Sequence, residues 1–366
     1  MRLLSALLFP ISVLYGTVTF VRNKMFDCGI LPSEKFDVPV ICVGNLSVGG
    51  TGKTPHTEYL ARLLSARYRV AVLSRGYKRK SKGFVLADER TTARELGDEP
   101  YQIRRKFPDI KVAVDADRRN GITRLMQLPD EEKPEVIILD DAFQHRYVKP
   151  TLSLLLTDCK RLYTSDYVLP AGRLREWKSG ASRADIIIVT KCKADISDEE
   201  RENILRQISP SKKQRVFFTY INYGELLPVF GDRSDALMNV TSGNPEVILL
   251  TGIANPLPLK NKVEEFSSNI DMLSFPDHHD FSEADILSVE NCLKTGKDSR
   301  KIVVTTEKDA VRLLANPYLS DEYKERFYYI PIRIDFCGGE AEEFDRIVFD
   351  KGVNKLRSQG VKELSS

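Results

Sequence analysis

Short apolar runs rich in β-branched residues recur along the chain, and most of them end at a polar or acidic residue. They lie at 40–43, 68–73, 111–114, 135–139, 152–156, 184–190, 247–250, 272–275, 302–305 and 327–334. Runs of this length predict buried strands, and the segments between them, such as 282–294, have the spacing of helices. Strands that alternate with helices predict an α/β protein with a mostly parallel sheet in each half of the chain.

The polar stretch after the sixth run divides these strands into two blocks. Val216–Tyr220 and Leu226–Phe230 flank Asn222, Tyr223 and Gly224, which predicts a hairpin, and residues 231–244 are polar and loop-like. A chain of 366 residues is long enough for two domains. We therefore predict a main domain over 26–215, a hairpin linker over 216–244 and a smaller α/β lobe over 245–366.

The N-terminal stretch is the longest apolar segment of the chain. Leu3–Phe20 contains no charged residue, and its 18 residues stand at the lower limit for a membrane span. Pro10 and Gly16 interrupt it, which favours a kinked or interfacial helix over residues 1–25, flanked by cations that suit anionic headgroups. A helix buried in the core is the alternative, and a cleaved signal peptide conflicts with the nucleotide site predicted below.

Composition excludes several classes of protein. The net charge is only +3, which does not suggest a nucleic-acid partner. The six cysteines are scattered without a C-x-x-C pair, which argues against a zinc site and a disulfide framework.

A Gly-rich turn follows the first strand and leads into a predicted helix that opens at Lys53. Strand, Gly-rich turn and helix form the context of a phosphate-binding P-loop, in which backbone N–H groups surround a phosphate. Lys53 would reach the β- and γ-phosphates of ATP, and the Thr54 hydroxyl would hold Mg²⁺. The strict motif has Gly where this chain has Ser47, and a plain glycine turn is the alternative. The predicted nucleotide-binding residues are Ser47, Val48, Gly49, Gly50, Thr51, Gly52, Lys53, Thr54 and Pro55.

The run at 135–139 is followed by Asp140 and Asp141. An acid at the carboxyl end of a buried strand is typical of a Walker B residue that holds Mg²⁺ directly or through water. Neighbouring residues of a strand point to opposite sides, so one carboxylate is expected to face the metal and the other a nearby loop. A strand-end turn residue is the alternative for Asp140.

Three further stretches carry charge near predicted strand ends. Arg75 and Tyr77 precede a basic run that could attract an anionic substrate, or form a solvated loop. Arg173 and Arg175 could clamp phosphates or pair with surface acids. Residues 190–193 (T-K-C-K) approach the guanine-reading motif of GTPases, but Lys193 stands where an acceptor is needed, so guanine specificity is not supported.

Taken in order, the motifs resemble one family. They read S-V-G-G-T-G-K-T-P, S-R-G-Y, G-D-E-P, D-D-A-F-Q-H, G-R-L-R-E, T-G-I-A-N-P, F-P-D-H-H-D-F and T-E-K-D. Each is weak alone, but the set closely resembles the tetraacyldisaccharide 4′-kinases (lipid A 4′-kinases) from Leu3 to about Asp309. Ala142 and Lys78 depart from that family's usual pattern.

The resemblance implies a P-loop NTPase-like kinase in two lobes with a hydrophobic N-terminal helix. It implies transfer of the ATP γ-phosphate to the 4′-hydroxyl of tetraacyldisaccharide 1-phosphate, with Mg²⁺, by a monomer bound to the cytoplasmic face of the bacterial inner membrane. Asp98 would be the catalytic base, oriented by His278, with Lys53 as the third catalytic residue. The implied metal ligands are Thr54, Asp140 and Glu176, and the other residues of the implied site are Glu99, Asp141, Gln144, His145, Arg75 and Tyr77.

Two other functions remain open from sequence. A membrane-attached P-loop ATPase, acting as a switch or assembly factor, would hydrolyse ATP without a lipid acceptor. A soluble small-molecule kinase or ligase would remain active without residues 1–25.

Overall fold

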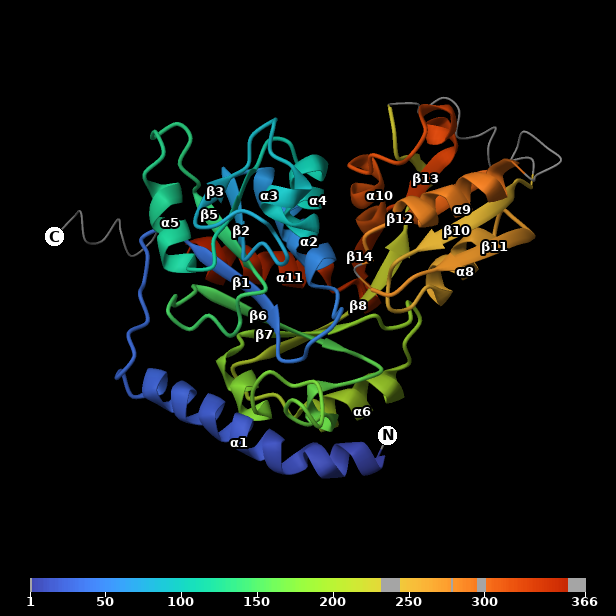
Figure 1. Cartoon of the computed structure of the whole chain (residues 1–366). Coiled ribbons are helices and arrows are strands. Elements are labelled where there is room, and N and C mark those ends of the chain that lie inside the picture. Colours follow the sequence, from blue (N-terminus) through green and yellow to red (C-terminus); the bar gives the residue numbers. More distant parts are fainter. Residues whose placement is uncertain (1, 232–243, 278, 295–300, 355–366) are drawn as a thin grey trace. The chain divides into compact units, whose positions relative to one another are not determined.

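The computed structural model describes residues 2–231, 244–277, 279–294 and 301–354 (Figure 1). Its contacts divide the chain into two compact units. The first comprises Met1–Thr91, Ile103–Ile221 and Ile334–Ser366, and the second comprises Thr92–Gln102 and Asn222–Arg333. Each unit has its own sheet.

The sheet of the first unit has nine strands in the order β14-β8-β7-β6-β1-β5-β2-β4-β3 within the described residues. Pairing is parallel from β8 through β4, and β3 is antiparallel to β4. The predicted parallel α/β fold is therefore confirmed. The strands are β1 (Val40–Asn45), β2 (Val70–Ser74), β3 (Val85–Leu86), β4 (Lys111–Val114), β5 (Val136–Asp140), β6 (Leu152–Asp158), β7 (Ile186–Thr190), β8 (Arg215–Tyr223) and β14 (Ile332–Phe336).

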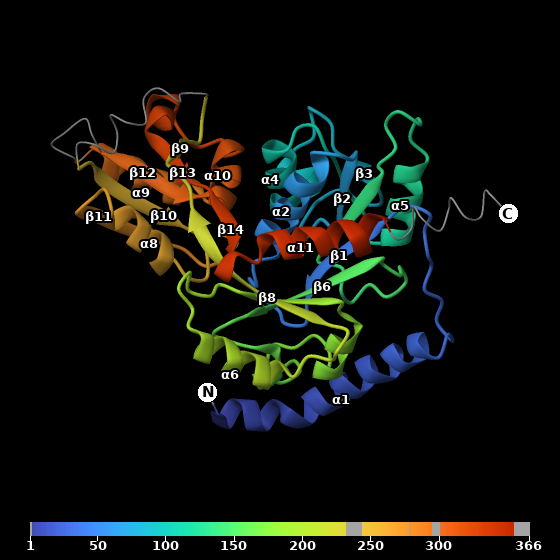
Figure 2. The same cartoon turned by 180° about the vertical axis from the view of Figure 1, so that it is seen from behind.

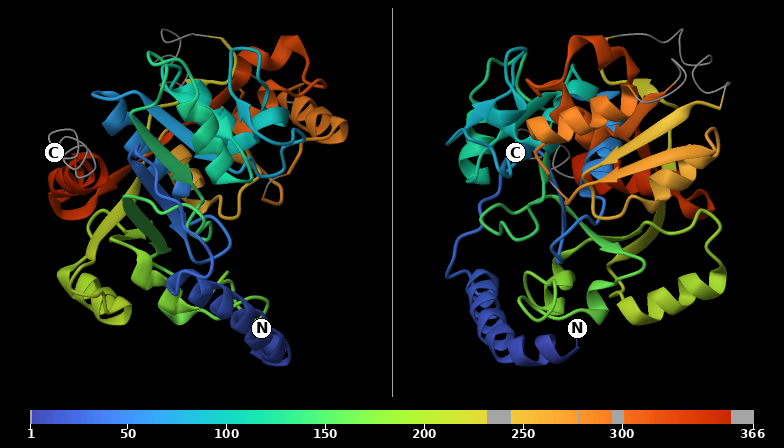
Figure 3. Two further views of the ribbon diagram at one scale, coloured as in Figure 1. Left: turned by 90° about the vertical axis from the view of Figure 1, so that its left-hand side faces the viewer. Right: turned by 45° about the vertical axis from the view of Figure 1, so that its right-hand side comes forward.

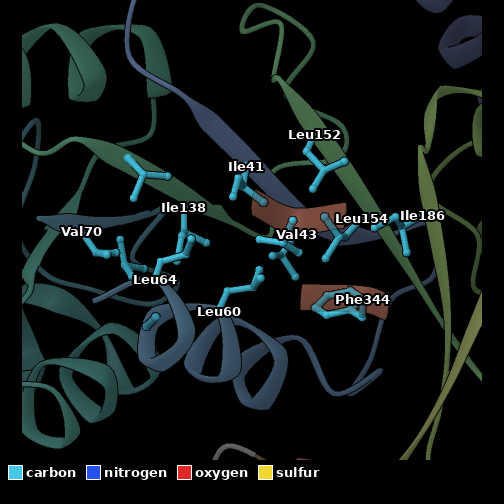
Figure 4. Close-up of a cluster of buried hydrophobic side chains, with 14 of the residues drawn as sticks. Ile41, Val43, Leu60, Leu64, Val70, Ile138, Leu152, Leu154, Ile186 and Phe344 are labelled. Carbon is cyan, nitrogen blue, oxygen red and sulfur yellow. The ribbon is translucent and has the colours of Figure 1, made fainter. Parts of the chain in front are cut away.

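Helices cover both faces of this sheet because its central strands are apolar on both sides. On one face, Ile41 and Val43 of β1 pack with Leu60 of α2 and Phe344 of α11 (Figure 4). On the other, Cys42 belongs to a cluster with residues of α5. The helices of this unit are α1 (Arg2–Asp27), α2 (Lys53–Ser65), the end of α4 (Asp98–Lys106), α5 (Arg118–Met126), α6 (Asp198–Ile208) and α11 (Ala341–Ile347), with a π-helical stretch at Val348–Asn354.

The predicted N-terminal helix is present as α1, which lies beside the loop that follows β6 (Figure 3). The Ser12 hydroxyl accepts a hydrogen bond from the Ala171 N–H at 2.8 Å. Gly16 faces Trp177 so closely that a Cβ there would stand 2.6 Å from the indole ring. Small residues on one face therefore let α1 dock on the first unit. Among the described helices, none is long and apolar enough to cross a bilayer.

Over its described residues, the second unit is built on a five-stranded sheet with the order β11-β10-β12-β13-β9. Its pairing is parallel except between β13 and β9. Residues of α9 and α10 pack on one face and residues of α8 on the other. The elements are α3 (Ala93–Leu96), the start of α4, β9 (Leu227–Pro228), β10 (Glu246–Thr251), α8 (Leu257–Glu264), β11 (Asn269–Ser274), α9 (Glu283–Lys294), β12 (Ile302–Thr306), α10 (Glu307–Leu314) and β13 (Phe327–Ile330).

The hairpin predicted over 216–230 is wrong. β8 pairs with β7 of the first sheet, whereas β9 pairs with β13 of the second. The chain segment between these strands therefore passes from one sheet to the other instead of turning back on itself. The role of 216–244 as a linker stays a prediction, and residues 232–243 lie outside the described part.

The boundary predicted at residue 245 also differs from the structure at the C-terminus. Pro331 separates β13 from β14, and β14 is the edge strand beside β8 of the first sheet. The π-helical stretch packs on β1 and β6 (Figure 2), where a Cβ at Gly352 would lie 3.1 Å from Ile41. The last elements thus belong to the first unit, because their apolar faces complete its core. The helix predicted over 340–359 is present as α11 and continues without a break as the π-helical stretch to Asn354, and its predicted end lies outside the described residues.

The third difference concerns the segment that contains Asp98. The predicted boundaries placed it in the main domain, but Thr92–Gln102 clusters with the second unit. A contact with α10, described below, is the physical reason.

Candidate active site

The loop between β1 and α2 has the backbone of an anion-binding turn. Gly49 and Gly52 have φ values of +107° and +84°, which residues with a Cβ rarely adopt. A Cβ placed on Gly49 or Gly50 would meet no atom within 4 Å, so this backbone borders open space. α2 begins at Lys53 without a side-chain cap, which leaves N–H donors and the positive end of the helix dipole at the loop.

Neighbouring strands and loops hold this turn in place. The Val48 N–H donates to the Arg173 carbonyl at 2.8 Å. The hydroxyl of Thr51 accepts from the Asn45 side-chain amide at 2.7 Å, and the carbonyl of Thr51 accepts from the Thr190 hydroxyl at 2.9 Å. These contacts fix the loop to β1, to β7 and to the loop that follows β6.

The stretch that approaches a guanine-reading motif serves the same turn. Lys191 donates a short hydrogen bond to the Gly50 carbonyl and forms an ion pair with Asp158 at 2.9 Å. The ammonium group therefore links the end of β6 to the Gly-rich turn, a role that sequence reasoning missed.

Lys53 lies near Asp141, with 3.7 Å between its Nζ and the Asp141 Oδ1. Arg175 donates to both oxygens of Asp141, at 2.9 and 3.2 Å. Burial opposes ionisation of Asp141, but Lys53 and Arg175 outweigh it and lower the pKa of this carboxyl below its ordinary value. Asp141 is thus ionised and forms ion pairs with two cations. The sequence left open whether Arg175 clamps phosphates or pairs with an acid, and in the structure it pairs with Asp141.

Asp140 has different surroundings, as its position next to Asp141 predicts. It ends β5, is 1 % exposed, and accepts from the Thr57 hydroxyl at 3.0 Å and the Ser74 hydroxyl at 3.3 Å. Burial, and then the charge of Asp141, raise the pKa of Asp140. A buried carboxylate held by neutral donors is an environment that a bound cation would stabilise.

This donor set fits Mg²⁺. A carboxylate and the hydroxyl of Thr54 are oxygen ligands, and Mg²⁺ in phosphate-binding sites is held by one or two carboxylates plus substrate phosphates. In the part of the chain that the structure describes, no group of three His, Cys, Asp or Glu side chains is arranged to hold a metal by itself.

Glu176 is 2 % exposed and belongs to a polar cluster of the first unit. It accepts from Arg183 at 2.8 Å, from Asn23 of α1 at 2.6 Å and from Gln144 at 3.1 Å. Gln144 also donates to the carbonyl of Asn45 at 2.8 Å. Glu176 and Gln144 thus connect α1 to the end of β1, and the role of Glu176 as a metal ligand stays a prediction.

The remaining predicted residues of the first unit lie at strand ends. His145 is half-buried, and burial, followed by the charge of Arg118, lowers its pKa to about 4. Arg75 follows β2 and is exposed, and Tyr77 is 64 % exposed with the Lys78 ammonium over its ring. A role for Arg75 and Tyr77 in the site stays a prediction.

Asp98 and Glu99 begin α4 in the second unit. Two nitrogens of Arg312 donate to Asp98 Oδ2, at 2.9 and 2.7 Å. This contact binds the start of α4 to α10 and explains why Thr92–Gln102 clusters with the second unit. His278, predicted to orient Asp98, lies outside the described residues.

The described geometry accords with comparisons to known proteins. A family model described as Tetraacyldisaccharide-1-P 4′-kinase matches residues 4–351. The chain belongs to this family. Tetraacyldisaccharide 4′-kinases of Parabacteroides distasonis and Bacteroides thetaiotaomicron are 51 % and 49 % identical to it, over 93 % and 97 % of this chain and 93 % and 95 % of their own.

A solved structure supports the fold of this family member. The crystal structure of Aquifex aeolicus LpxK in complex with ATP is 31 % identical, covers 95 % of this chain and 99 % of its own, and superposes with a TM-score of 0.72. The resemblance stated from the motifs, the P-loop kinase fold and the prediction of a kinase are therefore confirmed.

Sequence reasoning missed several residues that support the site. Thr57 lies one helical turn after Thr54, a spacing that could have suggested its hydroxyl. Asn45 ends the strand before the Gly-rich turn, and a polar residue at that position is a weak indication that its side chain supports the turn. Asn23 gave no local signal, because its partner Glu176 is 153 residues away in the sequence. Arg183 lies only seven residues after Glu176, but no pattern in the loop between them indicated the ion pair.

Proposed function

We propose that this member of the tetraacyldisaccharide-1-P 4′-kinase family transfers the γ-phosphate of ATP to the 4′-hydroxyl of tetraacyldisaccharide 1-phosphate. The observation that carries the proposal is the Gly-rich turn with Lys53 beside Asp141, in a chain whose family is named for this reaction. ATP as the donor is supported by the nucleotide in the Aquifex aeolicus relative.

The residues of the first unit would bind and orient the nucleotide. N–H groups of residues 49–54 surround the phosphates, and the Lys53 ammonium pairs with the β- and γ-phosphate oxygens. Thr54 and Asp140 would hold Mg²⁺, which neutralises charge on the transferring phosphoryl group when bound. Asp141, which also pairs with Arg175, would hold the Lys53 ammonium in position for these oxygens.

Asp98 would accept the proton of the attacking 4′-hydroxyl, and His278 would orient it. Phosphoryl transfer depends mainly on positioning and charge neutralisation, and a carboxylate within reach of the hydroxyl completes the requirement. Asp98 belongs to the second unit.

The lipid acceptor would be reached from the membrane surface. Leu7, Ile11, Leu14, Val18 and Val21 of α1 are each between 51 and 70 % exposed, and their spacing puts them on one face. The opposite face is the one that docks on the first unit. An apolar stripe of this kind suits the acyl region of a bilayer, and we place the protein as a monomer on the cytoplasmic face of the inner membrane.

A transfer assay tests this function directly. ATP labelled in its γ-phosphate is incubated with Mg²⁺ and tetraacyldisaccharide 1-phosphate in mixed micelles, with Lys53→Ala beside the wild type. Lys212→Ala, a change of an exposed lysine, is the matched control. We expect a labelled bisphosphorylated lipid from the wild type and the control, and none from Lys53→Ala.

Two other outcomes would contradict the proposal. Free labelled phosphate without labelled lipid, from the wild type only, would indicate a P-loop ATPase. Transfer to a soluble sugar, with full activity after replacement of Leu14 and Val18 by Glu, would indicate a soluble small-molecule kinase.

A further inference from the structure

Two motif stretches of the second unit have no part in the nucleotide site, yet the structure brings them together. They are T-G-I-A-N-P, after β10, and T-E-K-D, at the start of α10. The Asp309 carboxylate accepts from the Gly252 N–H at 2.9 Å and from the Thr306 hydroxyl at 2.8 Å. Asp309 is fully buried. Its carboxylate is therefore fixed by backbone and side-chain donors from two strand ends.

The fixed carboxylate in turn holds Arg312, one turn further along α10. Arg312 Nη1 donates to Asp309 Oδ1 at 2.8 Å, and the Arg312 side chain is only 5 % exposed. Space around this pair is limited, since a Cβ on Gly252 would lie 3.0 Å from Asp309 Oδ1 and 3.5 Å from Arg312 Nη1. The planar guanidinium thus has a defined position and orientation.

The other edge of the guanidinium faces Asp98. Arg312 Nε and Nη2 donate to the same oxygen, Asp98 Oδ2, at 2.9 and 2.7 Å. Two charge-assisted hydrogen bonds therefore hold this one oxygen in place. Neither of these two Arg312 nitrogens donates to the other carboxylate oxygen, Asp98 Oδ1.

We propose that Arg312 is a positioning residue, which holds Asp98 Oδ2 so that Oδ1 is presented to the hydroxyl of the acceptor. The proposal rests on the proposed role of Asp98 as the base. In the reaction, the hydroxyl oxygen bonds to the γ-phosphorus, the bond to the β-phosphate oxygen breaks, and the hydroxyl proton moves to Asp98 Oδ1. Arg312 keeps its proton and its two hydrogen bonds to Asp98 throughout.

A second contact of α10 is consistent with this assignment. Lys308, four residues before Arg312 and on the same face of the helix, forms an ion pair with Asp277 at 3.1 Å. One helix face therefore contacts both Asp98 and Asp277.

The alternative is an ion pair that only stabilises the second unit, and kinetics separate the two roles. The full-length protein is assayed for lipid phosphorylation in mixed micelles as wild type, Arg312→Met, Arg312→Lys, Asp98→Asn and the Asp98→Asn/Arg312→Met double variant. Lys260→Met is the control, because it removes the exposed Lys260–Glu264 ion pair (2.7 Å) from the same unit. Thermal unfolding of each variant is measured in parallel.

We expect Arg312→Met to lower kcat roughly 100-fold, because a displacement of about 1 Å costs about that much, while KM for ATP and lipid changes less than about threefold. Arg312→Lys, with charge but no paired donors, should lower kcat roughly 10-fold. In the Asp98→Asn background, Arg312→Met should lower the residual rate less than about twofold, because the group that it positions is already absent.

Each contrary result has a definite meaning. If Arg312→Lys has the kcat of the wild type while Asp98→Asn is impaired, Arg312 has no positioning role, but Asp98 can still be the base. This result is decisive even if Arg312→Met does not fold. An equal further loss in the Asp98→Asn background also overturns it, because Arg312 would then act elsewhere. A wild-type rate in Asp98→Asn refutes the base assigned under the proposed function, and the positioning role with it.

Discussion

The buried ion pair between Glu176 and Arg183 offers a sharp test of the site in the first unit. Glu176 is the predicted metal ligand that the structure surrounds with protein donors. Replacing Arg183 by Met keeps most of the side-chain volume but removes the positive charge 2.8 Å from the Glu176 carboxylate.

The expected loss follows from the exposure of the two partners. The Glu176 side chain is 3 % exposed and the Arg183 side chain 20 %. Removing one partner of a buried pair costs about 3–5 kcal/mol, because the remaining charge is left uncompensated. Asn23 and Gln144 still donate to Glu176, so we expect the lower end, about 3 kcal/mol of unfolding free energy.

A second substitution separates charge from packing. Glu176→Gln removes the stranded charge, so the Arg183→Met/Glu176→Gln double variant should regain about 2 kcal/mol relative to Arg183→Met, as expected for contacting residues. Arg206→Met, a change of an exposed arginine on α6, should alter stability by less than about 0.5 kcal/mol.

The assay is urea unfolding at pH 7, followed by the fluorescence of Trp177. This is the only tryptophan of the chain and belongs to the first unit, so its signal reports the unit under test. A loss below about 1 kcal/mol for Arg183→Met, or no recovery in the double variant, would refute this reasoning. Unchanged kcat in Glu176→Gln would exclude Glu176 as a metal ligand.

Three further predictions concern the same unit. Phe344→Ala should cost about 3–5 kcal/mol, because Phe344 is 1 % exposed and packs against Tyr59, Phe217 and Phe336; a loss no larger than that of exposed Glu342→Ala would exclude α11 from this core. The pKa of His145 is lowered to about 4, so below pH 6.5 the unfolded chain binds a proton that the native protein does not, and stability falls toward pH 4. Between pH 7 and 5 this difference in pKa lowers the unfolding free energy of the wild type by about 2 kcal/mol, a loss that His145→Gln should not show. Urea unfolding that gives the same loss for both proteins would contradict the prediction. Gly16→Val should displace α1 from Trp177 and shift its emission to longer wavelength, whereas exposed Val18→Ala should not; an unshifted Gly16→Val spectrum would place α1 elsewhere.

The local order of strand, Gly-rich turn and helix could be predicted because each part depends on neighbouring residues. Val40–Val43 is a short apolar run, the glycines permit the turn, and Lys53 opens the helix. The acids at the end of β5 could be predicted for the same reason, since the apolar run of this strand stops at Asp140. These signals span fewer than about twenty residues, which is the range over which periodicity and turn chemistry act.

The separate roles of Asp140 and Asp141 could not be predicted in this way. Both follow the same run, and alternation indicates only that they point apart. Thr57 and Ser74 on one side, and Lys53 and Arg175 on the other, come from elements brought close only by the parallel sheet. The tertiary structure therefore decides that the pKa of Asp140 is raised and that of Asp141 is lowered.

What the sequence by itself determined was most of the strands and helices, the nucleotide-binding turn and, through the ordered motifs, the family. The run at 327–334, predicted as one strand, is divided at Pro331 into β13 and β14. Only the tertiary structure decided that β14 and α11 complete the first sheet and its core, that 216–230 is not a hairpin, and that Arg312 holds Asp98 across 214 residues of sequence. The physical reason is that pairing of strand edges and burial of apolar faces select partners by fit in three dimensions. Such partners leave no mark in the local pattern of either segment.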